Sequence, residues 1–114
     1  MKDCLFCKIA NKEIPSEAVF ENEDVFAFND INPEAPVHVL VIPKVHISSL
    51  NDVNEENSKH ISRIFEIIPE IAKKAGIDES GYRIVSNCGK DAMQTVNHVH
   101  FHILGKRSLQ WPPG

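Results

Sequence analysis

Positive charge is scarce in this chain of 114 residues. Lysine and arginine together number 12 against 16 aspartates and glutamates, which gives a formal net charge of -4 and a pI near 5.8. Nucleic acids and anionic membrane surfaces bind proteins mainly through clustered lysines and arginines. The basic residues here are scattered singly or in pairs, so we expect neither of these partners.

Long hydrophobic runs are also absent from the sequence. A membrane-spanning helix needs roughly 18 or more apolar residues in a row, and no segment approaches that length. The opening segment MKDCLFCKIANKEIP lacks the apolar core of a signal peptide. We therefore expect a cytoplasmic protein, in which Cys4, Cys7 and Cys88 are thiols or metal ligands rather than disulfides.

The remaining composition is that of an ordinary globular protein. Hydrophobic residues make up 42% and charged residues 25% of the chain, and this length suffices to bury a core without disulfides. No internal repeat or low-complexity segment divides the sequence. We expect a single domain over residues 1–114, with a C-terminal tail at 105–114.

Local patterns predict an order of strands, one long helix and further strands. One helical turn is expected over residues 4–10. Tight connections are expected near Asn22 and near Lys90, so most strands should pair with antiparallel neighbours in an α+β fold. Apolar runs bounded by turn residues predict strands within residues 18–28 (as a hairpin), 37–42, 82–86 and 96–104.

The long helix is predicted from apolar residues at steps of three and four between Ile61 and Ala75. Asp52 followed by Glu55 is the pattern of a capping box, and Gly76 is a natural C-terminal stop. Pro69 lacks an N–H and crowds the preceding turn, so we expect it to kink or divide the helix.

Three of the six histidines alternate with apolar residues between His98 and Leu104. In an extended strand, successive side chains point to opposite faces, so the imidazoles would share one face, with Val99, Phe101 and Ile103 packed beneath. Burying a row of polar rings is costly unless the rings have partners or a function. The row is therefore a candidate functional site.

Strand geometry divides this row between different tasks. His98 and His102 would lie about 13 Å apart along a strand, too far for both to bind one zinc ion at about 2.1 Å. Cys4 and Cys7 form a CxxC pair, and His46 follows a predicted strand. These three residues and one histidine of the row have the composition of a closed, structural zinc site.

Other interpretations stay open for the same residues. Thioredoxin-like redox sites also contain CxxC, but there it follows a strand, whereas Cys4 has only three residues before it. Cys4 and Cys7 could instead be buried thiols that pack as small hydrophobes. His60 is expected to be structural or solvated, and His38, inside a predicted strand, is expected to be packed or hydrogen-bonded rather than catalytic. Cys88 has no partner near it in the sequence.

The motif HVHFHIL resembles the signature of the histidine triad (HIT) superfamily. The segments DINPEAPVHVLVIPKVHI, 87–96 and the terminal WPPG resemble its branch of histidine triad nucleotide-binding proteins, the purine nucleoside phosphoramidases, in the type that carries CxxC. This resemblance implies a HIT-like fold, with an antiparallel sheet of about five strands, one long helix and a short N-terminal helix. It also implies a homodimer, whose partner would give the exposed Trp111 a surface to cover.

The resemblance implies an activity as well. Members cleave nucleoside 5′-phosphoramidates, such as adenosine phosphoramidate, or acyl-nucleotides. His100 would attack the α-phosphorus and form a covalent nucleotidyl-histidine, while His102 would bind the phosphate. The residues that would stabilise charge or contact the nucleotide are Asn87 and Thr95 at the phosphate, Asp30 at the ribose, Phe6, Ile9, Phe28 and Ile31 around the base, and Gln94.

By the same resemblance, structural zinc would lie between Cys4, Cys7, His46 and His98, and catalysis would require no metal. Met93 stands where related chains tend to have glycine, and Asn29 and Asn97 also differ from common family choices.

Purely structural roles for these residues, and other functions for the protein, are alternatives to this assignment. Without the resemblance, a turn residue before two prolines is nearly as good an explanation of Asp30, and the aromatic and aliphatic residues could be ordinary core. A noncatalytic nucleotide-binding or scaffold protein with structural zinc is the alternative function. A zinc-containing domain that binds nucleic acid is disfavoured by the negative net charge of the chain.

Overall fold

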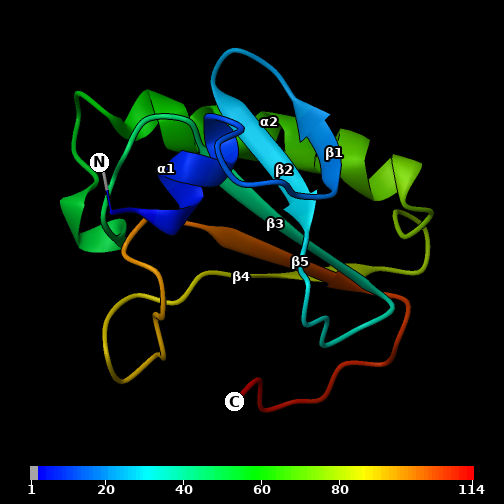
Figure 1. The fold of residues 1–114 in the computed structure, drawn as a ribbon. Helices are drawn as coiled ribbons and strands as arrows, with labels where there is room; N and C mark the ends of the chain where they lie inside the picture. The colour runs from blue at the N-terminus through cyan, green and yellow to red at the C-terminus, as the bar shows by residue number, and fades with distance from the viewer. Residues whose placement is uncertain (1–2) are drawn as a thin grey trace.

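Five strands form one antiparallel sheet in the computed structural model of this chain, which describes residues 3–114 (Figure 1). Their order across the sheet is β1-β2-β3-β5-β4, and each neighbouring pair is antiparallel. The predicted α+β class, with one short and one long helix, is confirmed. The elements are α1 (Leu5–Ala10), β1 (Ala18–Glu21), β2 (Val25–Asn29), β3 (Val37–Pro43), a 3₁₀ turn (Leu50–Asp52), α2 (Ser58–Lys74), β4 (Tyr82–Val85) and β5 (Phe101–Gly105).

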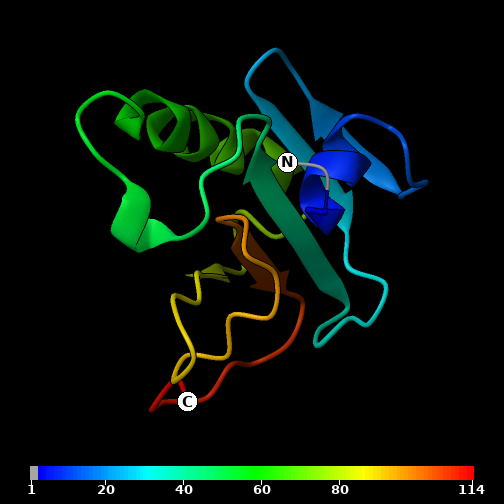
Figure 2. The same cartoon turned by 60° about the vertical axis from the view of Figure 1, so that its left-hand side comes forward.

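The two helices cover opposite faces of the sheet (Figures 1 and 2). Strand β3 shows why both faces are apolar: Val39 and Val41 pack in the cluster that contains α2, while Leu40 and Ile42 pack in the cluster that contains α1. Successive side chains of a strand point to opposite faces, so a strand covered on both sides has a continuous apolar sequence. The histidines between Val99 and Ile103 consequently lie on the α1 side.

Helix α2 runs without interruption through Pro69, so the predicted division of the helix does not occur. The predicted capping box is also wrong, because Asp52 lies in the 3₁₀ turn and the helix begins only at Ser58. Gly76 follows the helix with a φ of 73°, which confirms the glycine stop. No helix within residues 3–114 has the length and hydropathy that crossing a bilayer requires.

The histidine strand is shorter than predicted. Pairing with β3 begins only at Phe101 and pairing with β4 at His102. The connection from β4 is a long loop rather than a tight turn near Lys90. The backbone just before β5 forms a hydrogen bond outside the sheet, in which the Val99 N–H donates to the Ile47 carbonyl at 2.6 Å. The alternation nevertheless persists, because Val99 and Phe101 lie in the α2-side core.

Candidate functional site

Five of the six histidines gather on the α1 side of the sheet. Ring-centroid distances of 5.0 to 5.2 Å join His46 to His98, His100 to His102 and His38 to His102. Three segments that are distant in sequence supply them: β3, the loop after β3, and the segment that enters β5. The sheet order places β5 beside β3, which brings His38 next to the predicted row.

His100 is buried with one ring nitrogen fixed and the other available. Its Nδ1–H donates to the His98 carbonyl at 2.7 Å, so Nε2 is unprotonated in the neutral ring. Burial lowers the pKa of His100, although the hydrogen bond to His98 and the negative charge of Asp30 oppose that shift. The Phe6 ring packs edge-on against the imidazole at 5.0 Å between centroids. A neutral imidazole with a free Nε2 is a competent nucleophile.

His38 determines the protonation pattern of His102. The backbone N–H of Glu34 donates to His38 Nδ1 at 3.0 Å, so the ring proton of neutral His38 resides on Nε2. That Nε2 lies 2.9 Å from His102 Nδ1, which therefore accepts and leaves His102 Nε2 protonated as a donor. Burial lowers the pKa of His102 to about 4, which keeps its ring neutral near pH 7.

Asp30, His38 and His102 lie close enough to suggest a cation site, since their nearest ligand atoms are all within 4.8 Å of one another. A metal ligand must offer a lone pair, whereas His38 Nε2 carries a proton because its Nδ1 accepts from Glu34. The proton on Nε2 instead faces His102 Nδ1 and, at 3.4 Å, Asp30 Oδ2. These three residues therefore form a hydrogen-bonded group rather than a metal site.

The second group consists of Cys4, Cys7, His46 and His98, whose ligand atoms also lie within 4.8 Å of one another. Sulfur-to-Nδ1 distances are 3.3 Å for Cys4–His98, 3.3 Å for Cys7–His46 and 3.5 Å for Cys7–His98. A tetrahedral zinc ion with ordinary bond lengths sets sulfur and nitrogen ligands about 3.5 Å apart. The four residues therefore fit zinc in spacing as well as in chemistry.

Both histidines of this group offer Nδ1 because Nε2 has another partner. His98 Nε2 lies 2.9 Å from the Pro43 carbonyl, and His46 Nε2 lies 3.1 Å from Ser48 Oγ. Burial lowers the pKa of His46 and lowers that of His98 to about 4, so both rings are neutral and can act as ligands. Burial raises the pKa of the Cys7 thiol, a shift that a bound cation would oppose.

The residues expected at the base and ribose are partly brought together. Phe6, Ile9 and Phe28 belong to one buried cluster, with the rings of Phe6 and Phe28 edge-to-face at 5.6 Å. Asp30 is half-buried beyond the end of β2, where Oδ1 accepts the Asn32 N–H at 2.8 Å and so also has the turn role considered for it. Ile31 is 89% exposed and lies outside the buried cluster.

The loop between β4 and β5 is ordered by its own polar side chains. Asn87 Nδ2 donates to the Ala92 carbonyl at 2.7 Å, and Gln94 Nε2 donates to the Ser48 carbonyl at 2.8 Å. Met93 has a φ of 61°, a backbone conformation that favours glycine over residues with a side chain.

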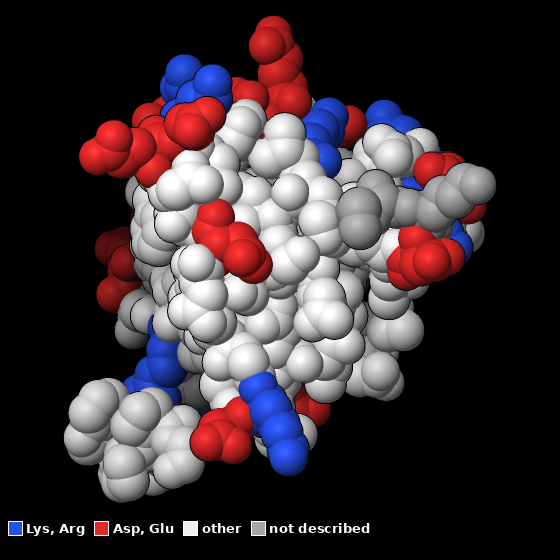
Figure 3. All heavy atoms as spheres, turned by 90° about the vertical axis from the view of Figure 1, so that its left-hand side faces the viewer, with Lys and Arg blue, Asp and Glu red and all other residues white. Residues whose placement is uncertain are grey.

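Thr95 is exposed and lines an open cavity of about 740 Å³ next to the metal group. Cys4, Leu5, His46 and Ser48 also line this cavity. Figure 3 shows the side of the molecule that is on the left in Figure 1, and charged side chains there lie mainly toward the margin. No basic stripe of the kind that binds nucleic acid crosses this view.

Two residues of the site lie outside the set expected from the sequence. His38 was expected to be packed or hydrogen-bonded rather than catalytic, and only the pairing of β3 with β5 reveals that its partner is His102. Ser86, just after β4, donates from Oγ to the His100 carbonyl at 2.8 Å and so holds the backbone of the candidate nucleophile. A lone serine at a strand end carries no sequence signal for such a contact.

Comparisons with known proteins agree with this arrangement. The sequence profile of the HIT domain matches residues 11–109. The maize 14 kDa zinc-binding protein is 45% identical over 112 residues, covering 96% of this chain and 87% of the relative. The purine nucleoside phosphoramidase of Escherichia coli K12 is 41% identical over 108 residues, covering 95% and 91%. The crystal structure of a HIT family hydrolase from Legionella pneumophila superimposes with a TM-score of 0.95 at 47% identity, covering 98% of this chain and 100% of that one.

Proposed function

The chain belongs to the HIT family, and from this premise we propose that it cleaves purine nucleoside 5′-phosphoramidates or acyl-nucleotides through a covalent intermediate on His100. The observation that carries the proposal is the state of His100. Its Nδ1–H is fixed by the His98 carbonyl at 2.7 Å, and burial lowers its pKa. The hydrogen bond selects the tautomer that leaves Nε2 free, and burial favours the neutral ring, so that Nε2 can attack phosphorus.

The proposed reaction has two steps. In the first, His100 Nε2 forms a bond to the α-phosphorus while the bond from phosphorus to the amine nitrogen or to the carboxylate oxygen breaks; an amine leaves with a proton from solvent, and a carboxylate leaves as the anion. In the second, water attacks the same phosphorus and gives up one proton to solvent, the bond to His100 breaks, and a nucleoside monophosphate is released. His102 would donate from Nε2 to a phosphoryl oxygen, a tautomer that His38 supports from 2.9 Å.

The nucleotide would lie across the α1 side of the sheet. Phe6, Ile9 and Phe28 would contact the purine, and Asp30 would accept hydrogen bonds from the ribose hydroxyls. Exposed Ile31 would cover the base. Asn87, Gln94 and Thr95 would contact the phosphate from the loop before β5, and Thr95 would help to protonate the leaving group.

We propose that zinc has a structural role at Cys4, Cys7, His46 and His98. The sulfur-to-nitrogen distances of 3.3 to 3.5 Å and the neutral histidines support it, as does the name of the maize relative. Such a closed ligand set leaves no coordination position for substrate, so the metal would take no direct part in the chemical steps. Thiol ligands of this kind remain reduced in the cytoplasm, which is the proposed location.

We propose further that the whole chain is a single unit that forms homodimers through the β4 end of the sheet. Helix α2 packs over β2 and β3, whereas the apolar side chains Tyr82 and Ile84 of β4 are only half-buried. Phe65, which packs on Phe101 of β5 at 5.3 Å, is 50% exposed. A second copy that covered this end would also protect β4, the edge strand.

The direct test is mass spectrometry of the intact protein during turnover of adenosine phosphoramidate. The parent protein should gain the mass of one nucleotidyl group on His100, and His100→Gln should gain none. We expect His100→Gln to lose at least about a thousandfold in kcat/KM, because no other group replaces the nucleophile. AMP should still bind to this variant.

The matched control is His60→Gln, which changes a histidine on α2, on the opposite face of the sheet. It should retain the parent rate and the nucleotide adduct. Comparable turnover by His100→Gln would reject the assigned nucleophile. AMP binding by the parent protein without turnover of any phosphoramidate or acyl-nucleotide would instead favour the noncatalytic alternative.

A further inference from the structure

His98 belongs to the metal group and to the nucleophile's surroundings at the same time. Its ring offers Nδ1 to Cys4 at 3.3 Å and to Cys7 at 3.5 Å, while its backbone carbonyl accepts the Nδ1–H of His100 at 2.7 Å. Any change in the placement of this residue therefore moves the acceptor that orients the His100 ring.

The His98 ring directs one nitrogen at both thiols of the metal group. Nδ1 has one lone pair, yet both sulfur atoms approach it. A tetrahedral ion accommodates this arrangement, because all four ligand atoms lie within 4.8 Å of one another and can bind the same ion. The arrangement of His98 in the structure is thus the one that a bound metal stabilises.

Helix α1 depends on the same group for its position. It has six residues, which is too short for a stable isolated helix. Within the described residues, the backbone hydrogen bonds of the segment 4–14 all remain inside that segment. Its apolar side chains pack on the sheet, and the sulfur atoms of Cys4 and Cys7 approach His98 and His46.

Phe6 lies between the two cysteines and contacts both histidines of interest. Its ring packs edge-on against His98 at 6.1 Å and against His100 at 5.0 Å between centroids. A metal ion that fixes Cys4 and Cys7 therefore also fixes the Phe6 ring against the imidazole of His100.

We propose that the metal bound by Cys4, Cys7, His46 and His98 positions His100 for reaction, with His98 as the positioning residue. The metal fixes the His98 carbonyl that orients the His100 ring, and it fixes α1, whose Phe6 packs against that ring. The inference rests on the proposed function of His100 and assigns to the metal a role in the rate as well as in stability.

The test compares the full-length parent protein with Cys4→Ser, which removes one ligand, and Cys4→His, which restores a fourth ligand. Zinc content is measured first, followed by amide hydrogen exchange, kcat and KM. We expect exchange in α1 and in residues 96–100 to accelerate at least about tenfold in Cys4→Ser, with smaller changes in β2, β3 and β5. We expect kcat to fall about 10- to 100-fold, as for other groups that orient reactive ligands, and KM to change less.

Cys4→His with added Zn²⁺ should recover zinc binding, slow exchange in α1 and most of kcat. Cys88→Ser, which changes a thiol outside the group, is the matched control and should resemble the parent protein. Unchanged kcat and unchanged exchange in α1 in zinc-free Cys4→Ser would overturn the inference. Equal acceleration of exchange throughout the sheet would also overturn it, because the metal would then hold the whole fold rather than His100.

Failure of the proposed function gives a different result. In that case the zinc-loaded parent protein forms no nucleotide adduct on His100. If the loaded parent forms the adduct and Cys4→Ser forms it equally fast, the positioning inference alone fails.

Discussion

At the scale of single residues, backbone partners decide what each histidine can do. The His98 carbonyl accepts a hydrogen bond from His100 Nδ1, which must therefore carry the ring proton. His38 Nδ1 accepts from the Glu34 N–H and is therefore unprotonated. The first bond leaves a nucleophilic Nε2, whereas the second makes His38 a donor toward His102. Chemically identical side chains thus acquire different roles from bonds that no sequence motif displays.

The pH dependence of kcat/KM should reflect the lowered pKa of His100. Burial lowers that pKa below the ordinary imidazole value of 6.5, and the neutral ring is the reactive form. Between pH 6.5 and the lowered pKa, an ordinary exposed histidine is largely protonated while His100 stays neutral. We therefore expect kcat/KM to remain flat as the pH falls through 6.5 and to decline only below it, in a pH–rate profile of the free enzyme.

Asp30→Asn provides a matched test of this prediction. The negative charge of Asp30 raises the pKa of His100, so its removal should move the acid limb of the profile to lower pH. KM should rise as well if Asp30 binds the ribose. An acid limb at or above pH 6.5 in the parent protein would contradict the predicted neutral, buried His100.

At the scale of elements, β5 links the histidines to the rest of the core. Gly105 ends this strand, paired with Val37 on one side and with Tyr82 on the other. The fully buried Ile77 lies directly against the glycine. A side chain at this position would have to displace core atoms.

Gly105→Ala should destabilise the fold by about 1–3 kcal/mol, as is usual for overpacking a core. The added Cβ would lie 2.9 Å from both Cδ1 and Cγ2 of Ile77, closer than carbon atoms tolerate. Denaturant unfolding measures the change in the free energy of unfolding. Gly114→Ala is the control, because its Cβ would have no neighbour within 4 Å.

The contact with Ile77 can be isolated in a double-mutant cycle. Ile77→Ala costs stability by itself, but it makes room for the methyl group of Gly105→Ala. The penalty of Gly105→Ala should therefore be smaller in the Ile77→Ala background. An equal penalty in both backgrounds would show that the clash with Ile77 is not its cause.

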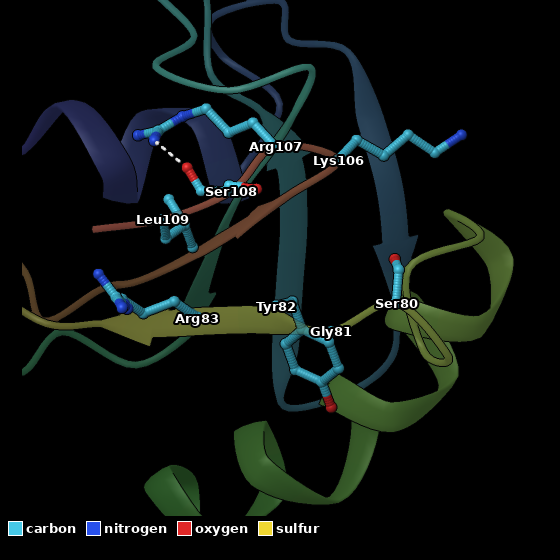
Figure 4. A pocket seen from close by; sticks show the side chains of 8 residues that line it. All are labelled: Ser80, Gly81, Tyr82, Arg83, Lys106, Arg107, Ser108 and Leu109. Atoms are coloured by element: carbon cyan, nitrogen blue, oxygen red, sulfur yellow. Dashed lines mark hydrogen bonds between the residues drawn. The ribbon is translucent and has the colours of Figure 1, made fainter. Parts of the chain in front are cut away.

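At the scale of the whole molecule, the β4 end of the sheet is only partly covered, because all four residues of β4 are half-buried. A cavity of about 480 Å³ lies along the chain at Gly81, Tyr82 and Arg83. Lys106 and Arg107 border its other side (Figure 4). Arg83 contacts the C-terminal tail: its Nη1 donates to the Gln110 carbonyl at 2.9 Å, and its guanidinium lies over the Trp111 ring. The C-terminal tail thus packs near this end.

The proposed homodimer predicts a particle of twice 12.8 kDa by light scattering coupled to size exclusion. Phe65→Lys should shift the population to monomer, because it places a charge in the apolar surface beside β5. Met93→Lys changes another exposed apolar residue, in the loop before β5, and should leave the dimer intact. A monomeric parent protein would reject the homodimer.

Much of the fold followed from local chemistry. The hairpin over β1 and β2, the strand before Pro43 and the glycine stop at Gly76 all lie where short-range patterns predicted them. Errors arose where local signals competed. Asp52 has the sequence of a cap but lies in a 3₁₀ turn, and Pro69 is tolerated inside α2, whose packing on the sheet outweighs one missing hydrogen bond.

What the sequence by itself determined is the inventory of groups and their alternation. Period-two spacing placed His98, His100 and His102 opposite Val99, Phe101 and Ile103, and this holds even where strand pairing stops. Only the tertiary structure decided which groups meet: Cys4 with His98, His38 with His102, and Ser86 with the His100 carbonyl. The physical reason is that side-chain direction follows from local backbone geometry, whereas these contacts depend on sheet order and on packing between segments far apart in the chain.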